Sequence, residues 1–269
     1  MTTNKINTFY TPLGNLDVEH LGHGSLRFEL DGMQIYVDPY SDICDYSKLP
    51  KADLIFITHA HTDHYDFNAI DLISTPKTEY IISKAVHTCL ENDLPTLKLN
   101  LDNNALQVDP STNLVSLATA KSCLKGGSIH TLYNGDHYNL KGMGITAIAA
   151  YNIKHKRDNG NPFHIKGEGN GYLINFGGFK MYIAGDTEFI LEMNTISLPD
   201  IAFLPKNLPY TMADEEFLEA ANAIKPKNLY PIHFFEIDAK SLAKRLDKGI
   251  CMYVDGVHYT NPTLDLELE

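Results

Sequence analysis

Two segments of this 269-residue chain share a pattern that predicts a β-hairpin, and this pair limits the choice of fold more than any other feature. The first, LRFELDGMQIYVDP, has apolar runs around an Asp-Gly turn and reaches Asp38 near its end. The second, YLINFGGFKMYIAGDT, has apolar runs around a Gly-Gly turn and reaches Asp186 near its end. Such dipeptides between strand-like runs are the strongest short-range signal for a hairpin. The likeness indicates two similar β-rich halves that face each other, although hairpins are common and the likeness could also be coincidental.

Strand-like and helix-like runs alternate along the rest of the chain. ADLIFITH and EYIIS are typical of buried strands, and each precedes a segment with helical spacing. IAFLP precedes TMADEEFLEAANAIKP, where Thr211 and Asp214 stand three apart as in a capping box and Pro226 marks the end. This order predicts an α/β protein with helices outside a pair of sheets. We expect residues 1–269 to form one domain, in which residues 96–130, which lack a clear period, form a lid, an oligomerisation element or an irregular insertion.

The stretch THAHTDH, residues 58–64, follows the apolar run DLIFI and concentrates side chains that bind metals. His59 and His61 are two residues apart, so at the end of a strand they point to the same side. Asp63 and His64 follow in the turn beyond and can face a second point nearby. Imidazoles and carboxylates suit zinc, manganese or iron, and strand ends that open into loops are where α/β proteins place their sites. The motif therefore predicts part of a site for two adjacent metals.

Four side chains cannot complete two metal sites, and three distant residues are candidates for the remainder. Asp186 follows KMYIAG, His233 follows LYPI, and His164 lies in the Gly-rich stretch NPFHIKGEGNGY. Each also has a purely structural interpretation, as a helix cap, a half-buried residue at a strand end and a loop residue, respectively. GEGNGY lacks the Lys-Ser/Thr of a P-loop, so we do not interpret it as a nucleotide-binding loop.

In this order the motifs resemble the metallo-β-lactamase superfamily of metal-dependent hydrolases, over about residues 16–259. The chain is most similar to the branch that contains the L-ascorbate-6-phosphate lactonase and related predicted zinc hydrolases. The matching stretches are LGHGSLRFELDG, YVDPY, AAYNIK, FHIKGEGNGYLI, IAGDTEFILEM and LPYTMADEEFLEAANAIKPKNLYPIHF. The resemblance implies a four-layer αββα sandwich with a metal site at one edge.

The resemblance also implies two divalent ions per chain, zinc or manganese, with iron as an alternative. By position, the implied ligands are His59, His61 and a mid-chain histidine for one ion, Asp63, His64 and His233 for the other, and Asp186 as the bridge.

The mid-chain ligand is where the match is weakest. Many relatives carry it directly after the strand that ends here in AIAAYN, a place that Asn152 occupies. We predict His164 as the ligand in preference to His155, with Asn152 close by to contact substrate or water.

The resemblance implies hydrolysis by a hydroxide that bridges the two metals, which depress the pKa of water and polarise the substrate. Asp63 would also orient that hydroxide, and His23, in LGHGS, is a candidate for proton transfer. We expect Asp38 to orient a ligand histidine, as carboxylates next to metal sites do. Candidate contacts to an anionic substrate are Asn152, Lys166, Tyr210 and Thr211.

Composition limits the partners of such an enzyme. The net charge of −12 opposes binding to nucleic acid or to an anionic membrane surface. The four cysteines form no C-x-x-C pair, and no apolar run reaches membrane-spanning length, so we expect a cytoplasmic protein with reduced thiols. An oligomer is compatible with these features.

The leading prediction is a dinuclear hydrolase of a small anionic ester, lactone or phosphodiester. The alternatives are a phosphodiesterase that acts on RNA and a non-catalytic metal-binding sensor or scaffold. A redox di-iron role is less favoured, because His61 stands where a carboxylate would suit iron chemistry.

Overall fold

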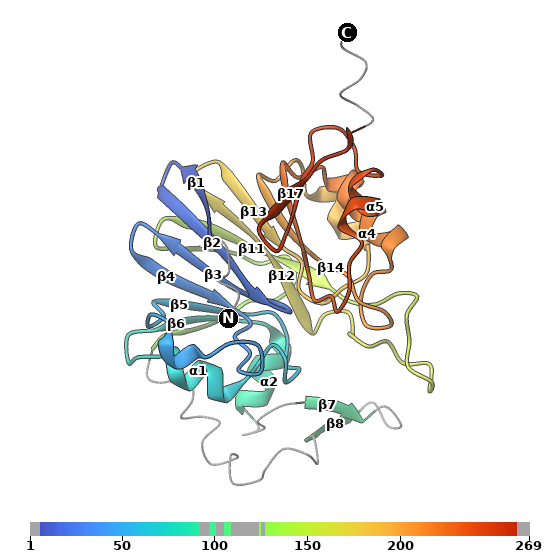
Figure 1. Cartoon of the computed structure of the whole chain (residues 1–269). Helices are drawn as coiled ribbons and strands as arrows, with labels where there is room; N and C mark the ends of the chain where they lie inside the picture. Colours follow the sequence, from blue (N-terminus) through green and yellow to red (C-terminus); the bar gives the residue numbers. More distant parts are fainter. Residues whose placement is uncertain (1–5, 92–96, 101–104, 109–123, 125–126, 263–269) are drawn as a thin grey trace.

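The computed structural model describes residues 6–91, 97–100, 105–108, 124 and 127–262, and its two large β-sheets pack face to face (Figure 1). In spatial order the first sheet contains β1 (Asn7–Thr11), β2 (Gly14–Gly22), β3 (Ser25–Leu30), β4 (Met33–Val37), β5 (Leu54–Ile57), β6 (Glu79–Ile82) and β9 (Ile129–Thr131). The second contains β10 (His137–Leu140), β11 (Met143–Ala150), β12 (Gly169–Phe176), β13 (Phe179–Ile183), β14 (Ile201–Pro205), β15 (Asn228–Ile232), β16 (Cys251–Val254) and β17 (Val257–Tyr259).

Both predicted hairpins are present, and each opens a similar arrangement. In the first sheet, β3 and β4 pair antiparallel, and the parallel strands β5 and β6 follow. In the second sheet, β12 and β13 pair antiparallel, and the parallel strands β14 and β15 follow. The likeness between the two segments therefore reflects two halves with the same local topology.

Helices cover the outer face of each sheet (Figure 1). The first sheet carries η1 (Tyr46–Lys48), α1 (Phe67–Ile73) and α2 (Lys84–Glu91), and the second carries η3 (Leu191–Thr195), α4 (Asp214–Ile224) and α5 (Ala239–Ala243). The predicted four-layer αββα sandwich is confirmed.

The core between the sheets is rich in aromatic side chains. Phe28 and Phe56 of the first sheet and Tyr172 and Phe203 of the second are completely buried there. Phe28 meets Phe203, and Phe56 meets Tyr172, with ring centroids 5.7 and 5.1 Å apart. Burial of one such apolar side chain contributes about 1.5–3 kcal/mol, so this layer fixes how the two sheets sit on each other.

The start of α4 differs from the sequence prediction. The helix begins at Asp214, and the carboxylate of Glu216 accepts a hydrogen bond from the backbone N–H of Ala213. Thr211 does not cap the helix, because its hydroxyl accepts a hydrogen bond from the N–H of Asn207 and closes a buried turn.

Residues 96–130, predicted as a lid or an insertion, lie largely outside the described residues. Within that range β7 (Leu97–Asn100) pairs antiparallel with β8 (Ala105–Val108). In the part of the chain that the structure describes, no helix has the length and apolar character needed to cross a bilayer.

The topology brings polar residues from both sheets to one edge. Asp38 follows β4, and His59 comes two residues after β5. In the second sheet, Asp186, Asn207 and His233 come just beyond β13, β14 and β15. The carboxyl ends of parallel strands open on the same edge of a sheet, where α/β folds place their sites.

Candidate metal centre

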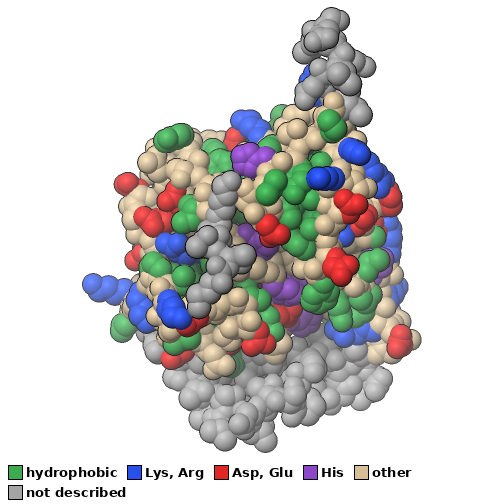
Figure 2. Space-filling model, viewed as in Figure 1, with side chains coloured by type: hydrophobic (Ala, Val, Ile, Leu, Met, Phe, Trp, Pro, Cys, Tyr) green, Lys and Arg blue, Asp and Glu red, His purple; other side chains and the backbone are tan. Residues whose placement is uncertain are grey.

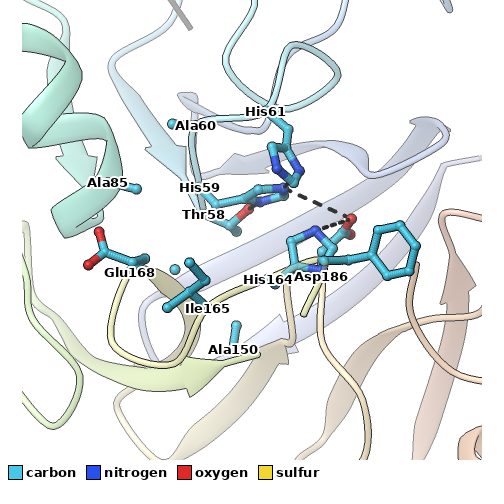
Figure 3. Close-up of a pocket in the computed structure, with 12 residues that line it drawn as sticks. Thr58, His59, Ala60, His61, Ala85, Ala150, His164, Ile165, Glu168 and Asp186 are labelled. Atoms are coloured by element: carbon cyan, nitrogen blue, oxygen red, sulfur yellow. Dashed lines mark hydrogen bonds and ion pairs between the residues drawn. The ribbon is translucent and has the colours of Figure 1, made fainter. Parts of the chain in front are cut away.

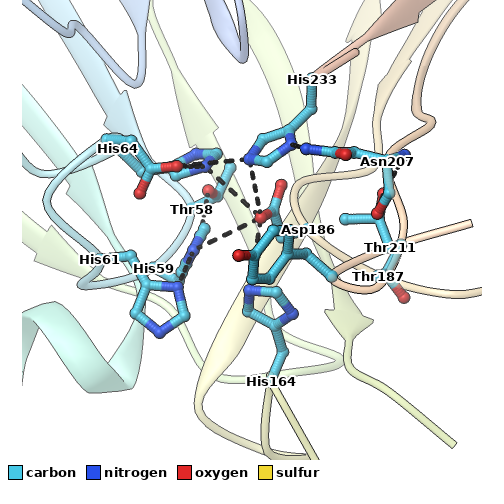
Figure 4. Close-up of polar contacts among 12 residues, drawn as sticks. Thr58, His59, His61, His64, His164, Asp186, Thr187, Asn207, Thr211 and His233 are labelled. Carbon is cyan, nitrogen blue, oxygen red and sulfur yellow. Dashed lines mark hydrogen bonds and ion pairs between the residues drawn. The ribbon is translucent and has the colours of Figure 1, made fainter. Parts of the chain in front are cut away.

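Histidines and carboxylates from distant parts of the chain converge at this edge (Figure 4). Histidine side chains also lie at the bottom of a hollow in the middle of the face shown in Figure 2, beside hydrophobic side chains. The structure brings together all of the predicted ligands: His59, His61, Asp63, His64, His164, Asp186 and His233.

Asp186 lies at the centre of the cluster. Its Oδ2 atom is 3.1 Å from Nε2 of His233, 3.3 Å from Nε2 of His164, 3.5 Å from Nε2 of His64 and 4.0 Å from Nε2 of His59. Two ligands of one tetrahedral metal, each about 2.0–2.1 Å from it, lie about 3.3 Å apart. The distances from Asp186 to His233, His164 and His64 are therefore compatible with groups that share a metal ion, whereas His59 lies farther away.

The remaining donors form one group on each side of Asp186. In one group, Nε2 of His59 and Nδ1 of His61 are 3.0 Å apart, and His164 lies within reach of both. In the other, Oδ2 of Asp63 is 3.6 Å from Nε2 of His64 and 3.4 Å from Nε2 of His233. Two donor sets that face a shared carboxylate suit two adjacent cations.

Several of these donor atoms are buried without a hydrogen-bond partner among the described residues. They are Nε2 of His64, His164 and His233, and Oδ1 of Asp186. A buried polar atom that lacks a partner costs about 1–3 kcal/mol. Cations at this position would satisfy the imidazole nitrogens and the carboxylate together, so the residues present fit a metal centre.

Asp38 orients two of the predicted ligands. Its Oδ2 atom accepts hydrogen bonds from Nδ1 of His64 at 2.8 Å and from the hydroxyl of Thr58 at 2.6 Å. The Thr58 hydroxyl lies 3.0 Å from Nδ1 of His59 and accepts from it. With a proton on each Nδ1, the Nε2 lone pairs face the centre, which is the arrangement that metal ligation requires.

Asn152 plays the same part for His164. Its Oδ1 accepts hydrogen bonds from the backbone N–H of His164 at 2.8 Å and from the ring Nδ1 at 2.7 Å. Its Nδ2 donates to Glu188 and to the carbonyl of Tyr210. Because the amide is buried and both of its polar atoms are occupied, the structure gives Asn152 a role in holding His164 and not the predicted contact with substrate or water.

His164, and not His155, occupies the mid-chain position of the cluster. Nε2 of His155 lies 2.9 Å from Oε2 of Glu216, on α4 and away from Asp186. The backbone of residues 153–155 is fixed by the buried carboxylate of Glu188, which accepts hydrogen bonds from all three N–H groups.

His23 lies beside the second donor group. Its Nε2 atom is 2.9 Å from Oδ2 of Asp63, and its side chain is 13% exposed. The backbone of His23 adopts a positive φ of 50°, which is uncommon outside glycine and turns the ring towards the centre. At the next residue, Gly24, a Cβ atom would lie only 2.9 Å from the ring of His64, so the close packing here requires a glycine.

Three other residues were predicted to contact an anionic substrate, and two of them, Lys166 and Thr211, already have partners within the chain. Nζ of Lys166 is paired with Glu192 at 2.7 Å and lies over the Tyr151 ring. Thr211 is completely buried, and its hydroxyl is used within its own turn, so a substrate cannot reach it. Tyr210 is 41% exposed, and its ring stacks edge-on against Phe163.

Burial and charge set the protonation of the cluster. Burial lowers the pKa of His61 to about 3 and the pKa of His59 well below its ordinary value, so both rings are neutral at pH 7. Burial would raise the pKa of Asp186, but His233 and other cationic neighbours hold it well below the ordinary range. Burial opposes a proton on His233, yet the Asp186 carboxylate outweighs it and raises the pKa of His233 to about 9. A cation bound at His233 would therefore displace a proton.

Three residues that support the centre are not among the residues predicted from the sequence. Thr58 orients His59, Glu188 fixes the loop of Asn152, and the amide of Asn207 lies 3.3 Å from Nδ1 of His233. Thr58 stands at the start of the motif at residues 58–64 but is not itself a typical metal ligand, and for Glu188 and Asn207 only their positions after strand ends could have suggested a role.

A cavity opens beside the first donor group (Figure 3). His59, His61, His164 and Asp186 form one wall. The rest of the lining is mostly apolar, with Ala60, Ala85, Ala150, Phe163 and Ile165, but it also includes Glu168, whose carboxylate pairs with Lys84.

The αββα sandwich and the donor set at its edge define the class of protein as one built around a metal-dependent site. Comparison with known proteins identifies the family. A family model described as the beta-lactamase superfamily domain matches residues 17–233. The chain belongs to that superfamily and, within it, to a family of metal-dependent hydrolases.

Relatives with this assignment match the chain over most of its length. A crystal structure of a protein from Parabacteroides distasonis, assigned as a metal-dependent hydrolase, is 34% identical, with a TM-score of 0.73, over 95% of this chain and 100% of that one. A UPF0173 metal-dependent hydrolase of an Exiguobacterium species is 26% identical over 81% of this chain and 86% of its own length. Igni18, a metallo hydrolase from Ignicoccus hospitalis, shares the fold, with 23% identity and a TM-score of 0.62 over 90% of this chain and 97% of that one.

Proposed function

We propose that the protein is a dinuclear hydrolase that holds two divalent ions, zinc or manganese. One ion would be bound by His59, His61 and His164, the other by Asp63, His64 and His233, and Asp186 would contact both. The observation that carries this proposal is the position of Asp186 Oδ2, between the two donor sets and at metal-sharing distances from the nearest imidazoles.

When bound, such ions supply a water of lowered pKa and polarise the substrate oxygen on which charge develops. The chain itself supplies the proton pathway. Burial would raise the pKa of Asp63, but His64, His23 and His233 hold it well below its ordinary range, so the carboxylate stays ionised and accepts hydrogen bonds. Nε2 of His23 lies 2.9 Å from that carboxylate, within reach for a proton transfer between the two groups.

We further propose a small anionic ester, lactone or phosphodiester as the substrate. The net charge of −12 disfavours a long polyanion such as RNA, because the mean field of the protein repels it. A small molecule with one anionic group can instead be bound by a single local cation.

Metal analysis tests the assignment of the centre. We expect about two metal ions per chain in the purified protein, loss of one in His61→Ala or His233→Ala, and loss of both in Asp186→Ala. His155→Ala is the matched control, because that histidine lies in the loop before His164 but pairs with α4. A wild-type chain that holds no metal, or an Asp186→Ala variant that keeps two, would contradict the proposal.

Catalysis is tested separately with phosphodiesters, sugar-phosphate lactones and thioesters, in the presence of added zinc or manganese. We expect turnover of at least one class, and its loss in Asp63→Asn at unchanged folding. Absence of turnover of all classes by a protein with both metals bound would favour the non-catalytic sensor.

A further inference from the structure

The loop before His164 contains a cation that has no anionic partner among the described residues. Arg157 is held in a tight hairpin, in which its N–H donates to the carbonyl of Asn161 and its own carbonyl accepts from Gly160. The guanidinium carbon lies 4.7 Å from the centre of the Phe163 ring. Phe163 precedes the predicted ligand His164 and lines the cavity beside the metal centre.

Among the described residues, two other cations of the same region are paired with carboxylates, unlike Arg157. Lys154 pairs with Glu216 at 2.8 Å, and Lys166 pairs with Glu192 at 2.7 Å. Within the described residues no carboxylate pairs with Arg157, and its Nε atom is buried without a hydrogen-bond partner. In a chain with 34 acidic and 22 basic residues, an arginine of this kind, in contact with a residue that lines a cavity, stands out.

An unpaired, partly buried guanidinium is expensive to keep unless it has a ligand. Burial lowers the pKa of Arg157, but an arginine stays charged in proteins, so it cannot escape the cost by losing its proton. The contact with the face of Phe163 positions the guanidinium without using its N–H groups. A planar fork of N–H donors held in this way matches two oxygens of a carboxylate or a phosphate.

We propose that Arg157 binds the oxyanion group of the substrate at the rim of the cavity, with Phe163 as its stacking platform. The uncharged part of the same molecule would occupy the apolar wall formed by Ala60, Ala85, Ala150 and Ile165. The substrate class is thus a short hydrocarbon that carries a carboxylate or a phosphate near the bond to be cleaved. That this ligand is a substrate rests on the proposed hydrolase function; that Arg157 binds an oxyanion does not.

Equilibrium binding to the metal-loaded protein tests this assignment without any need for turnover. The probes are pentanoate, its neutral isostere pentanamide, and butyl phosphate, measured by calorimetry with wild type, Arg157→Gln and Lys156→Gln. Lys156→Gln is the matched control, because it removes an exposed positive charge from the adjacent position. Any direct contact between an anion and the metals is common to all three proteins and cancels in the comparison.

We expect Arg157→Gln to weaken binding of at least one of the two anions by about tenfold or more, the loss expected for a charge-assisted hydrogen bond. Pentanamide affinity should stay within about twofold, and Lys156→Gln should behave as wild type. The anion with the larger loss identifies carboxylate or phosphate as the natural group. The assignment is overturned if wild type binds neither anion at about 10 mM, if Arg157→Gln binds both as wild type does, or if Lys156→Gln causes the same loss.

The outcome is distinguishable from that of the hydrolase proposal. A protein that binds the oxyanion through Arg157 but cleaves none of the tested substrate classes would refute the hydrolase proposal and leave this site intact. If the wild-type protein is an active hydrolase and Arg157→Gln binds anions as wild type does, the oxyanion site is refuted and the hydrolase proposal stands.

Discussion

Replacement of Asp38 by asparagine is the sharpest test of how the metal centre is held together. The carboxylate accepts three hydrogen bonds: Oδ1 from the N–H of Thr58 at 2.8 Å, and Oδ2 from the Thr58 hydroxyl at 2.6 Å and from Nδ1 of His64 at 2.8 Å. An amide has one oxygen, so it cannot accept on both sides. Either its NH₂ group faces His64, or it faces the Thr58 N–H.

Each orientation of the new amide has a predictable cost. If NH₂ faces His64, the proton of the ring moves to Nε2, which then cannot bind a metal. Loss of such an orienting partner typically reduces metal affinity by about 10–100-fold. If NH₂ faces Thr58 instead, a buried backbone N–H loses its acceptor, which costs about 1–3 kcal/mol of stability.

Two measurements on Asp38→Asn distinguish these outcomes. Metal affinity is measured by competition with a chelator, and the free energy of unfolding by urea denaturation of the metal-free protein. The matched control is Asp53→Asn, because Asp53 also accepts a backbone hydrogen bond, from Gln34 at 2.8 Å, but is exposed. If Asp38→Asn matches wild type in both measurements, the structural role assigned to Asp38 is refuted.

Three further substitutions test other parts of the structure. Gly24→Ala places a methyl group only 2.9 Å from the ring of His64, so we expect the variant to bind less metal than wild type when metal content is measured after dialysis. Tyr172→Phe removes the hydrogen bond from the buried hydroxyl to the carbonyl of Ile57 in the facing sheet, which should lower the free energy of unfolding by about 0.5–1.5 kcal/mol in urea titrations. Burial would raise the pKa of Glu216, but its lysine and histidine partners outweigh burial and lower the pKa from the usual 4.5. The ionised form of Glu216 therefore stabilises the fold above pH 4.5. This stabilisation is lost as the pH falls through the lowered pKa. Glu216→Gln should therefore be less stable than wild type at pH 7, with a difference that shrinks in acid; a difference independent of pH would contradict this.

Short-range patterns in the sequence were sufficient to predict a pair of sheets with helices outside them, and to predict histidine and carboxylate side chains as the metal ligands. Apolar periodicity and two turn dipeptides predicted both hairpins, because strand pairing across a two-residue turn depends on neighbouring residues alone. The motif at residues 58–64 predicted metal-binding side chains because His59 and His61 must share one side of an extended strand end.

The tertiary structure decided which distant groups face one another. His155 and His164 are equally good ligands by chemistry, and the family resemblance favoured His164; in the structure the packing of α4, which places Glu216 beside His155, separates them. The same holds for Asn152, which turned out to hold His164, and for Arg157, which no carboxylate in the described part of the chain approaches. Contacts of this kind depend on how two sheets and their helices pack over tens of residues of separation, and local sequence carries no record of that geometry.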